Sequence, residues 1–204
     1  MDQGAFSETL QHTRLVAIIR GLSPSETANV AAHLWENGVK LLEIPLYSES
    51  SKEAFERALE AKSSHPGALL GVGSVRTRED YLLANAIGAD FTVSPGLFPE
   101  VCAQARTDQH AHLPGVFTPT EIGKALALGF RTVKVFPAST HQPSGIQALT
   151  HPFPEAKIVA VGGVDPKNAP NYIAHGAAAV GMGTALTKQP DTIYSLLQKI
   201  VDQP

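Results

Sequence analysis

Two charged residues lie inside segments that otherwise resemble buried β-strands. Lys134 is flanked by Thr-Val and Val-Phe in the segment 132–136, and Glu43 is flanked by Leu-Leu and Ile-Pro in the segment 41–45. Strands that are covered on both faces are apolar, because a charge inside them loses its hydration. Each of these two charges therefore needs a partner or a chemical role.

A buried amine beside a carboxylate is suited to carbonyl chemistry. Removal from water favours the neutral form of an amine, which attacks a carbonyl carbon, and a nearby carboxylate can move the protons of carbinolamine formation and C–C cleavage. The alternative is an ion pair between Lys134 and Glu43 without any chemical role, which is a poor stabiliser because both charges are desolvated. The sequence favours Lys134 as a Schiff-base nucleophile and Glu43 as its proton-transferring partner.

Glycines follow two late apolar segments of the chain. Gly162 and Gly163 come directly after the segment 157–161, and Gly183 and Thr184 come after the segment 178–182. Barrels often bind phosphate with the loops that follow their last two strands, through backbone N–H groups. Tight turns also use glycine, but its presence in both loops favours a phosphate site.

Other polar residues follow further apolar segments. Arg20 directly follows the segment 15–19. There it could bind a carboxylate or phosphate, or form a salt bridge at the rim of a barrel. Ser74 and the Ser94-Pro95-Gly96 turn could offer hydroxyl or backbone donors. The histidines form no H-x-x-x-H or H-E-x-x-H pattern, so we expect no metal site and expect the histidines at the surface.

These residues must be positioned by a repeating βα chain. Short apolar runs recur along the sequence, each followed by a turn and a helix-period segment. The runs are 15–19, 41–45, 69–73, 91–94, 113–116, 132–136, 157–161 and 178–182. Eight such units in 204 residues predict one domain, 1–204, with the (β/α)8 TIM-barrel fold of the α/β class, whose active site lies at the C-terminal strand ends. Because side chains alternate along a strand, Lys134 shares the inward face with Thr132 and Phe136, as Glu43 does with Leu41 and Pro45.

Cap residues and glycines delimit the expected helices. Helix starts are expected at Ser23-Pro24, Thr77, Thr118-Pro119 and Asp165-Pro166. Helix ends are expected at Gly38, Gly88, Gly129 and Gly176. Short connections of this kind make consecutive parallel strands neighbours with right-handed crossovers.

Several classes of protein are disfavoured. An open dinucleotide-binding sheet would carry G-x-G-x-x-G after its first strand, and Gly71-Val72-Gly73 lacks the third glycine. A net charge of −3 with scattered basic residues offers no stripe for nucleic acid and no membrane patch. One cysteine, the lack of a signal-peptide core in residues 1–13 and the lack of a membrane-length apolar stretch predict a cytoplasmic protein with a small-molecule partner.

Six short motifs occur in order over nearly the whole chain. They are AIIRG at 17–21, EIPL at 43–46, GVGSV at 71–75, SPG at 94–96, KVFPA at 134–138 and AVGGV at 160–164. Together they resemble the 2-keto-3-deoxy-6-phosphogluconate (KDPG) / 4-hydroxy-2-oxoglutarate (KHG) aldolase family. The resemblance implies a class I, pyruvate-dependent aldolase, a lyase without metal or cofactor and commonly a homotrimer. Such an enzyme cleaves a phosphorylated 2-keto-3-deoxy sugar acid to pyruvate and glyceraldehyde 3-phosphate.

The resemblance also implies roles for single positions. Lys134 matches the Schiff-base lysine, and Glu43 matches the proton-transferring carboxylate. The positions that match substrate contacts are Arg20, Ser74, Pro95, Phe136 and Val161. The positions that match the phosphate site are Gly162, Gly163, Gly183 and Thr184.

Two departures bear on the substrate. Tyr47 stands where gluconate-type enzymes carry arginine, and Val161 stands where they carry threonine. With the EIPL motif and the Ile-Arg-Gly segment, they resemble the phosphogalactonate branch, so we expect 2-dehydro-3-deoxy-6-phosphogalactonate as substrate. The alternatives are the gluconate epimer, unphosphorylated 4-hydroxy-2-oxoglutarate, a phosphate-binding barrel that is not an aldolase, and a catalytically inactive barrel.

Overall fold

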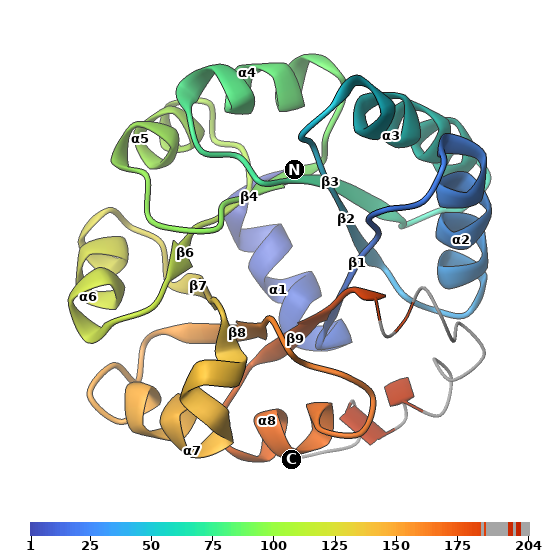
Figure 1. The fold of residues 1–204 in the computed structure, drawn as a ribbon. Coiled ribbons are helices and arrows are strands. Elements are labelled where there is room, and N and C mark those ends of the chain that lie inside the picture. Colours follow the sequence, from blue (N-terminus) through green and yellow to red (C-terminus); the bar gives the residue numbers. More distant parts are fainter. Residues whose placement is uncertain (185, 187–195, 198, 201–204) are drawn as a thin grey trace.

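The apolar runs of the sequence form a set of parallel strands in the computed structural model, which describes residues 1–184, 186, 196–197 and 199–200. The strands are β1 (Leu15–Ile18), β2 (Leu41–Pro45), β3 (Leu69–Gly73), β4 (Phe91–Val93), β5 (His112–Leu113), β6 (Gly115–Val116), β7 (Thr132–Val135), β8 (Lys157–Val161) and β9 (Ala179–Met182). They pair in the order β5-β4-β3-β2-β1-β9-β8-β7-β6. Figure 1 shows them as a central ring with helices outside, which confirms the TIM-barrel prediction.

The fifth expected strand, 113–116, is divided into β5 and β6. Pro114 lies between them and has no N–H group to donate to a ladder. Because β5 pairs with β4 and β6 pairs with β7, the chain through Pro114 closes the ring. One expected strand is thus two short strands on either side of a proline.

Helices cover the outside of the ring, except α1 (Gln3–Thr13), which lies across one end of it. The outer helices are α2 (Pro24–Glu36), α3 (Glu49–Lys62), α4 (Arg78–Ala86), α5 (Pro99–Thr107), α6 (Pro119–Ala127), α7 (Ala138–Thr150) and α8 (Ala169–Ala174). Ser23, Thr77 and Thr118 are N-caps, each within a capping box, as their positions predicted. The segment after β9 lies largely outside the described residues.

The expected helix start at Asp165-Pro166 is wrong, because α8 begins at Ala169. The Asp165 carboxylate accepts hydrogen bonds from the backbone N–H groups of Lys167 at 2.8 Å and Asn168 at 2.9 Å. An aspartate side chain that binds its own following backbone stabilises a turn. The expected helix ends are correct: Gly38, Gly88, Gly129 and Gly176 have φ between +88° and +92°, a region that favours glycine.

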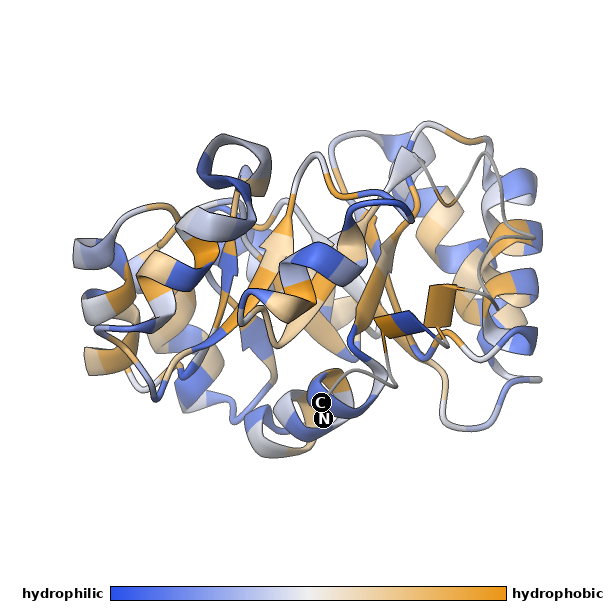
Figure 2. Cartoon of the chain, turned by 90° about the horizontal axis from the view of Figure 1, so that it is seen from below, coloured by the Kyte–Doolittle hydropathy of each residue, from blue (hydrophilic) through white to orange (hydrophobic). Residues whose placement is uncertain are grey.

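Helix α1 was not predicted and closes the N-terminal end of the barrel (Figure 2). Asp2 caps it, and the side chains of Phe6 and Leu10 are fully buried among the residues inside the ring. The rings of Phe6 and Phe91 of β4 are 4.9 Å apart between centroids. The hydroxyl of Ser7 lies 2.7 Å from that of Thr132, so α1 also contacts the lysine-bearing strand.

Two apolar layers surround the strands, and Figure 2 shows the strands as mostly hydrophobic. The inner layer includes Val16, Leu41 and Val159, and the outer layer joins Leu42, Val133 and many helix residues. Side chains of one strand therefore alternate between a small inner core and a larger outer core. No described helix is both long enough and apolar enough to cross a membrane.

Candidate active site

Lys134 lies on the inner face of β7, as strand parity predicted. Its neighbours Val133 and Val135 belong to the outer apolar layer. The side chain is only 6% exposed, and its Nζ atom lies 5.0 Å from the centroid of the Phe136 ring. The amine is therefore almost completely shielded from water, beside an aromatic ring, near the C-terminal ends of the strands.

Glu43 lies on the inner face of β2 and is 3% exposed. Burial raises the pKa of its carboxyl group, while the charges of Lys134 and Arg20 oppose this shift. In the part of the chain that the structure describes, no direct ion pair joins Glu43 to Lys134. The two groups thus influence each other electrostatically without forming the closed ion pair of the purely structural alternative.

Gly73 at the end of β3 provides the space for the Glu43 carboxylate. It pairs with Pro45 in the β2–β3 ladder. A Cβ atom at Gly73 would overlap the Glu43 Oε1 atom and lie 2.7 Å from its Cδ atom. Sequence reasoning did not assign this role to Gly73, because the overlap depends on how β2 and β3 are aligned.

The turn at Pro95 and Gly96 lies beside the lysine strand. A Cβ atom at Gly115 would lie 2.5 Å from the Gly96 nitrogen, so the turn packs directly on the Gly115 backbone. Gly115 pairs with Lys134 in the β6–β7 ladder. The expected contact position Pro95 is thus close to Lys134 along the sheet.

Ser74 and Ser94 differ in what they can offer a ligand. Ser74 is half-buried and has a φ of +63°, an uncommon conformation for a serine. Ser94 is fully buried, and its hydroxyl donates to the Val75 carbonyl oxygen at 2.5 Å. The Ser94 hydroxyl is therefore already used within the protein.

The glycines after β8 pack on the loop after β7. Gly162 and Gly163 have φ values of +92° and +77°. A Cβ atom at Gly162 would lie 3.0 Å from the Phe136 ring, and one at Gly163 would lie 2.6 Å from the Ser139 Cβ atom. Both positions thus require glycine for conformation and for space, independently of any ligand.

The remaining expected positions lie around the same end of the barrel. Val161 belongs to the inner core. Gly183 follows β9, and a Cβ atom there would be 3.6 Å from the Ile18 carbonyl oxygen of β1. Thr184 is the next residue and is exposed.

Tyr47 lies between two cavities at this end of the barrel. It is 63% exposed and lines one cavity with Arg20, which is itself exposed, and another of about 240 Å³ with Ser74. Tyr47 thus borders both the cavity of Arg20 and the cavity of Ser74.

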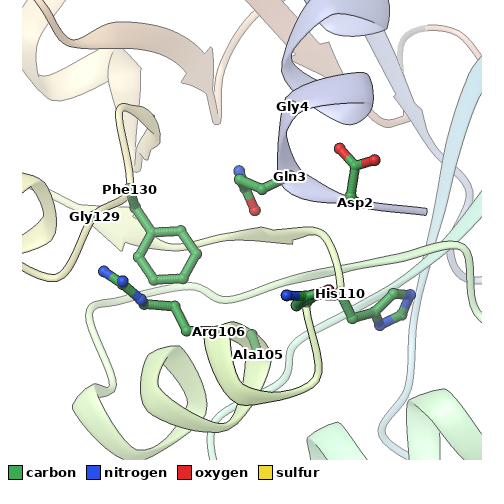
Figure 3. Close-up of a pocket in the computed structure, with 9 residues that line it drawn as sticks. Asp2, Gln3, Gly4, Ala105, Arg106, His110, Gly129 and Phe130 are labelled. Atoms are coloured by element: carbon green, nitrogen blue, oxygen red, sulfur yellow. The ribbon is translucent and has the colours of Figure 1, made fainter.

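A cavity of about 310 Å³ lies at the opposite end of the barrel (Figure 3). Asp2, the N-cap of α1, and Gln3 line one side, and Arg106 and Phe130 line the other. None of the expected site residues lines this cavity. It is therefore separate from the candidate site around Lys134.

The expectation that the histidines lie at the surface is wrong for His112. Its side chain is fully buried, and burial lowers its pKa to about 3. A single histidine carries no periodic signal that would have predicted this position. Among the described residues, no three His, Cys, Asp or Glu side chains gather where they could hold a metal ion.

Comparison with known proteins gives consistent results. Residues 6–200 match the family model of KDPG and KHG aldolases. A probable 2-dehydro-3-deoxy-6-phosphogalactonate aldolase of Rhizobium meliloti (strain 1021) is 40% identical over 175 residues, which is 85% of this chain and 82% of the relative. A 2-dehydro-3-deoxy-phosphogluconate aldolase of Haemophilus influenzae (strain ATCC 51907 / DSM 11121 / KW20 / Rd) is 34% identical over 171 residues, or 82% of this chain and 78% of the relative. A crystal structure of a 4-hydroxy-2-oxoglutarate/2-dehydro-3-deoxyphosphogluconate aldolase superposes with a TM-score of 0.81 at 34% identity, covering 96% of both chains.

Proposed function

The chain belongs to the KDPG and KHG aldolase family, and from this premise we propose that Lys134 forms the Schiff base of a class I aldolase. The proposed reaction cleaves 2-dehydro-3-deoxy-6-phosphogalactonate to pyruvate and D-glyceraldehyde 3-phosphate. The observation that carries the proposal is the Lys134 amine, which is almost fully buried on the inner face of the barrel and interacts electrostatically with the equally buried Glu43 carboxyl group. A structural lysine would gain little from such a position.

The reaction begins at the C2 carbonyl of the keto acid. The neutral Lys134 amine attacks C2, and the carbinolamine loses water to give a protonated imine. Removal of the C4 hydroxyl proton by the Glu43 carboxylate then allows the C3–C4 bond to break. The electron pair of the C3–C4 bond forms the C2=C3 double bond of an enamine, the C=N electron pair moves to the Lys134 nitrogen, and the aldehyde leaves. Protonation of C3 and hydrolysis of the resulting imine then release pyruvate and free Lys134.

The electrostatics of the pair support this order of steps. A positive charge on Lys134 opposes the burial effect that raises the pKa of Glu43. The protonated imine restores a positive charge at the same nitrogen after the neutral amine has reacted. Iminium formation therefore favours the carboxylate form of Glu43 at the step where a base is needed.

The phosphate and carboxylate of the substrate need separate binding groups. We assign the phosphate to the backbone at Gly162, Gly163 and Gly183 with the Thr184 side chain, since loops after the last strands of a barrel commonly bind phosphate. Arg20 is a cationic candidate for an anionic group, because its charge acts on Glu43. Ser74, Pro95, Phe136 and Val161 would contact the carbon chain.

The choice of galactonate epimer rests on Tyr47, Val161 and the relative that is 40% identical. The gluconate epimer is the second candidate, because a relative with that printed activity is 34% identical. Comparison of kcat/KM for the two epimers and for unphosphorylated 4-hydroxy-2-oxoglutarate distinguishes the candidates. A preference for the gluconate epimer, or no advantage from phosphate, would overturn the substrate assignment.

Trapping with borohydride tests the chemistry itself. Incubation with pyruvate and borohydride should give a reduced adduct on Lys134 that mass spectrometry locates. Lys134→Ala should remove both the adduct and the cleavage activity. No adduct, or an adduct that persists in Lys134→Ala, would contradict the mechanism.

Three further expectations concern the protein as a whole. Independence from a metal ion is tested by measuring the cleavage activity in EDTA. The homotrimer and the cytoplasmic location stay predictions.

A further inference from the structure

Three buried polar side chains point outward from β4, from the residue directly after it, and from β5. Thr92, Ser94 and His112 are all fully buried. Their strand neighbours Phe91 and Leu113 belong to the inner core, so these three face the layer between the barrel and the helices. The proposed chemistry on the inner face uses none of them.

The hydrogen bonds of this group fix the proton on the His112 ring. The Ser94 hydroxyl donates its only proton to the Val75 carbonyl oxygen at 2.5 Å. The His112 Nε2 atom lies 3.4 Å from the Ser94 Oγ atom, which can therefore only accept there. Nε2 carries the proton, so Nδ1 is the acceptor on the other side of the ring. The Thr92 hydroxyl lies 2.9 Å from Nδ1 and 3.4 Å from the Ala111 carbonyl oxygen, and the shorter contact is its donation to Nδ1.

Ser94 connects two loops at the mouth of the barrel. Val75 follows Ser74, and its N–H donates to the Val93 carbonyl oxygen at 3.1 Å, so Val75 is bound to the end of β4 through both its N–H and its carbonyl group. Ser94 also begins the Pro95 turn, whose Gly96 carbonyl oxygen accepts from Gly115 at 3.2 Å. One buried hydroxyl thus contacts the loop of Ser74 and belongs to the turn of Pro95.

The orientation of that hydroxyl depends on His112. A serine hydroxyl rotates freely, and a donor on its oxygen restricts the directions in which its own proton can point. When the His112 Nε2–H group points at Ser94 Oγ, the Ser94 O–H group points away from the ring and donates to the Val75 carbonyl oxygen. The imidazole and the Phe130 ring pack in a T-shaped arrangement, with centroids 5.7 Å apart at 85°, which restricts rotation of the imidazole.

We propose that His112 is a positioning residue, whose Nε2–H orients the Ser94 hydroxyl and thereby holds the Ser74 and Pro95 loops in the geometry that binds the keto acid at Lys134. The proposal rests on the proposed function, since the two loops matter only if they contact the substrate. The competing role is purely structural, in which the network adds stability and leaves the mouth unaffected.

Variants of the network separate these roles. His112→Leu removes the donor, whereas His112→Gln keeps an N–H donor near the Nε2 position. Thr92→Val is the matched control, because it removes the equally buried hydroxyl that contacts His112 Nδ1 and the Ala111 carbonyl oxygen and leaves the groups of the Ser94 contact in place. Steady-state kcat and KM are measured well below the melting temperature of each variant, together with borohydride trapping of pyruvate on Lys134.

We expect His112→Leu to lower kcat/KM about tenfold or more, because small displacements of binding groups reduce rates strongly. We expect His112→Gln to recover most of this loss and Thr92→Val to lose stability with little change in kcat/KM. The proposal is overturned if His112→Leu has the same kcat/KM as the parent protein. It is also overturned if Thr92→Val loses as much kcat/KM as His112→Leu does. If His112 acts through Ser94, the His112→Leu/Ser94→Ala double variant is no slower than Ser94→Ala alone, and additive losses contradict this.

The tautomer of His112 gives a readout that does not depend on activity. The ring ¹⁵N chemical shifts of the labelled parent protein should show a proton on Nε2 and none on Nδ1. A proton on Nδ1 would overturn the arrangement even if the protein is an active aldolase. Failure to trap pyruvate on Lys134 of the parent would instead contradict the proposed function, so the two failures are distinguishable.

Discussion

At the scale of single residues, Glu43 combines deep burial with two nearby positive charges. Burial is the largest effect and raises the pKa of its carboxyl group above the usual glutamate value of 4.5. The base form of a carboxyl group exists above its pKa. The acidic limb of kcat/KM should therefore lie above the pH at which an ordinary glutamate titrates, with activity falling as the pH decreases through it.

Glu43→Gln should lower kcat by roughly 10²- to 10⁴-fold, the usual contribution of a general acid–base group, and should remove this acidic limb. The amide is similar in shape but cannot exchange protons. The measurement is the pH profile of kcat/KM for parent and variant. A profile in Glu43→Gln with the same limb as the parent would assign the limb to another group.

A substitution at Gly73 tests whether the Glu43 carboxylate needs the space beside this glycine. In Gly73→Ala, the new Cβ atom would overlap the Glu43 carboxylate, which is the end of a flexible side chain. We expect the carboxylate to move while the fold persists, with kcat/KM reduced about 10- to 100-fold and only a small change in melting temperature. Gly123→Ala is the control, because its Cβ atom meets only Phe153 at 3.9 Å. Unchanged kcat/KM in Gly73→Ala would show that the position of Glu43 is not critical.

The sequence was sufficient to predict where Lys134 and Glu43 point, because a charge in an apolar strand is conspicuous and side chains alternate with a fixed period. The role of Gly73 could not be predicted in this way, because it depends on the alignment of two separate strands. His112 was missed for a different reason. One polar residue in a two-residue strand gives no pattern that distinguishes burial from exposure.

At the scale of elements, two glycines should respond in opposite ways to replacement by alanine. Gly123 lies in the interior of α6, where alanine fits and loses less conformational entropy on folding. Gly115 lies in β6 against the backbone of Pro95 and Gly96, which cannot move aside as a side chain can. We expect Gly123→Ala to stabilise the protein by about 0.5–1 kcal/mol. Gly115→Ala should destabilise it, as measured by urea denaturation. The opposite order of midpoints would contradict the close packing of the Pro95 turn.

The elements themselves were predicted where their signals are local. Capping residues and glycines located α2, α4 and α6, since each signal acts within one turn of a helix. The division of the fifth strand at Pro114 follows from the missing N–H group, but its position in the closed ring requires the pairing of β5 and β6. Helix α1 also carries a local signal in its Asp2 cap and in Phe6 and Leu10, whereas the surface that it covers depends on the assembled barrel.

At the scale of the whole molecule, two buried groups have opposite effects on stability as the pH changes. Glu43 has a raised pKa, so the folded state binds a proton more tightly than the unfolded state, and this contribution is lost as the pH rises through the raised value. His112 has its pKa lowered from 6.5 to about 3, so the unfolded state binds the proton more tightly. Its contribution is fully present above pH 6.5 and is lost as the pH falls toward 3.

His112→Gln isolates the second effect, because glutamine does not titrate and the other groups remain. The difference in unfolding free energy between parent and variant should be constant above about pH 7 and should change by roughly 2 kcal/mol between pH 7 and pH 5, with the parent losing more stability. Urea denaturation at several pH values measures this difference. A difference that does not change with pH would mean that His112 is protonated in the folded state as readily as in the unfolded state, and it would therefore contradict the neutral, fully buried imidazole on which the Nε2–H···Ser94 contact depends.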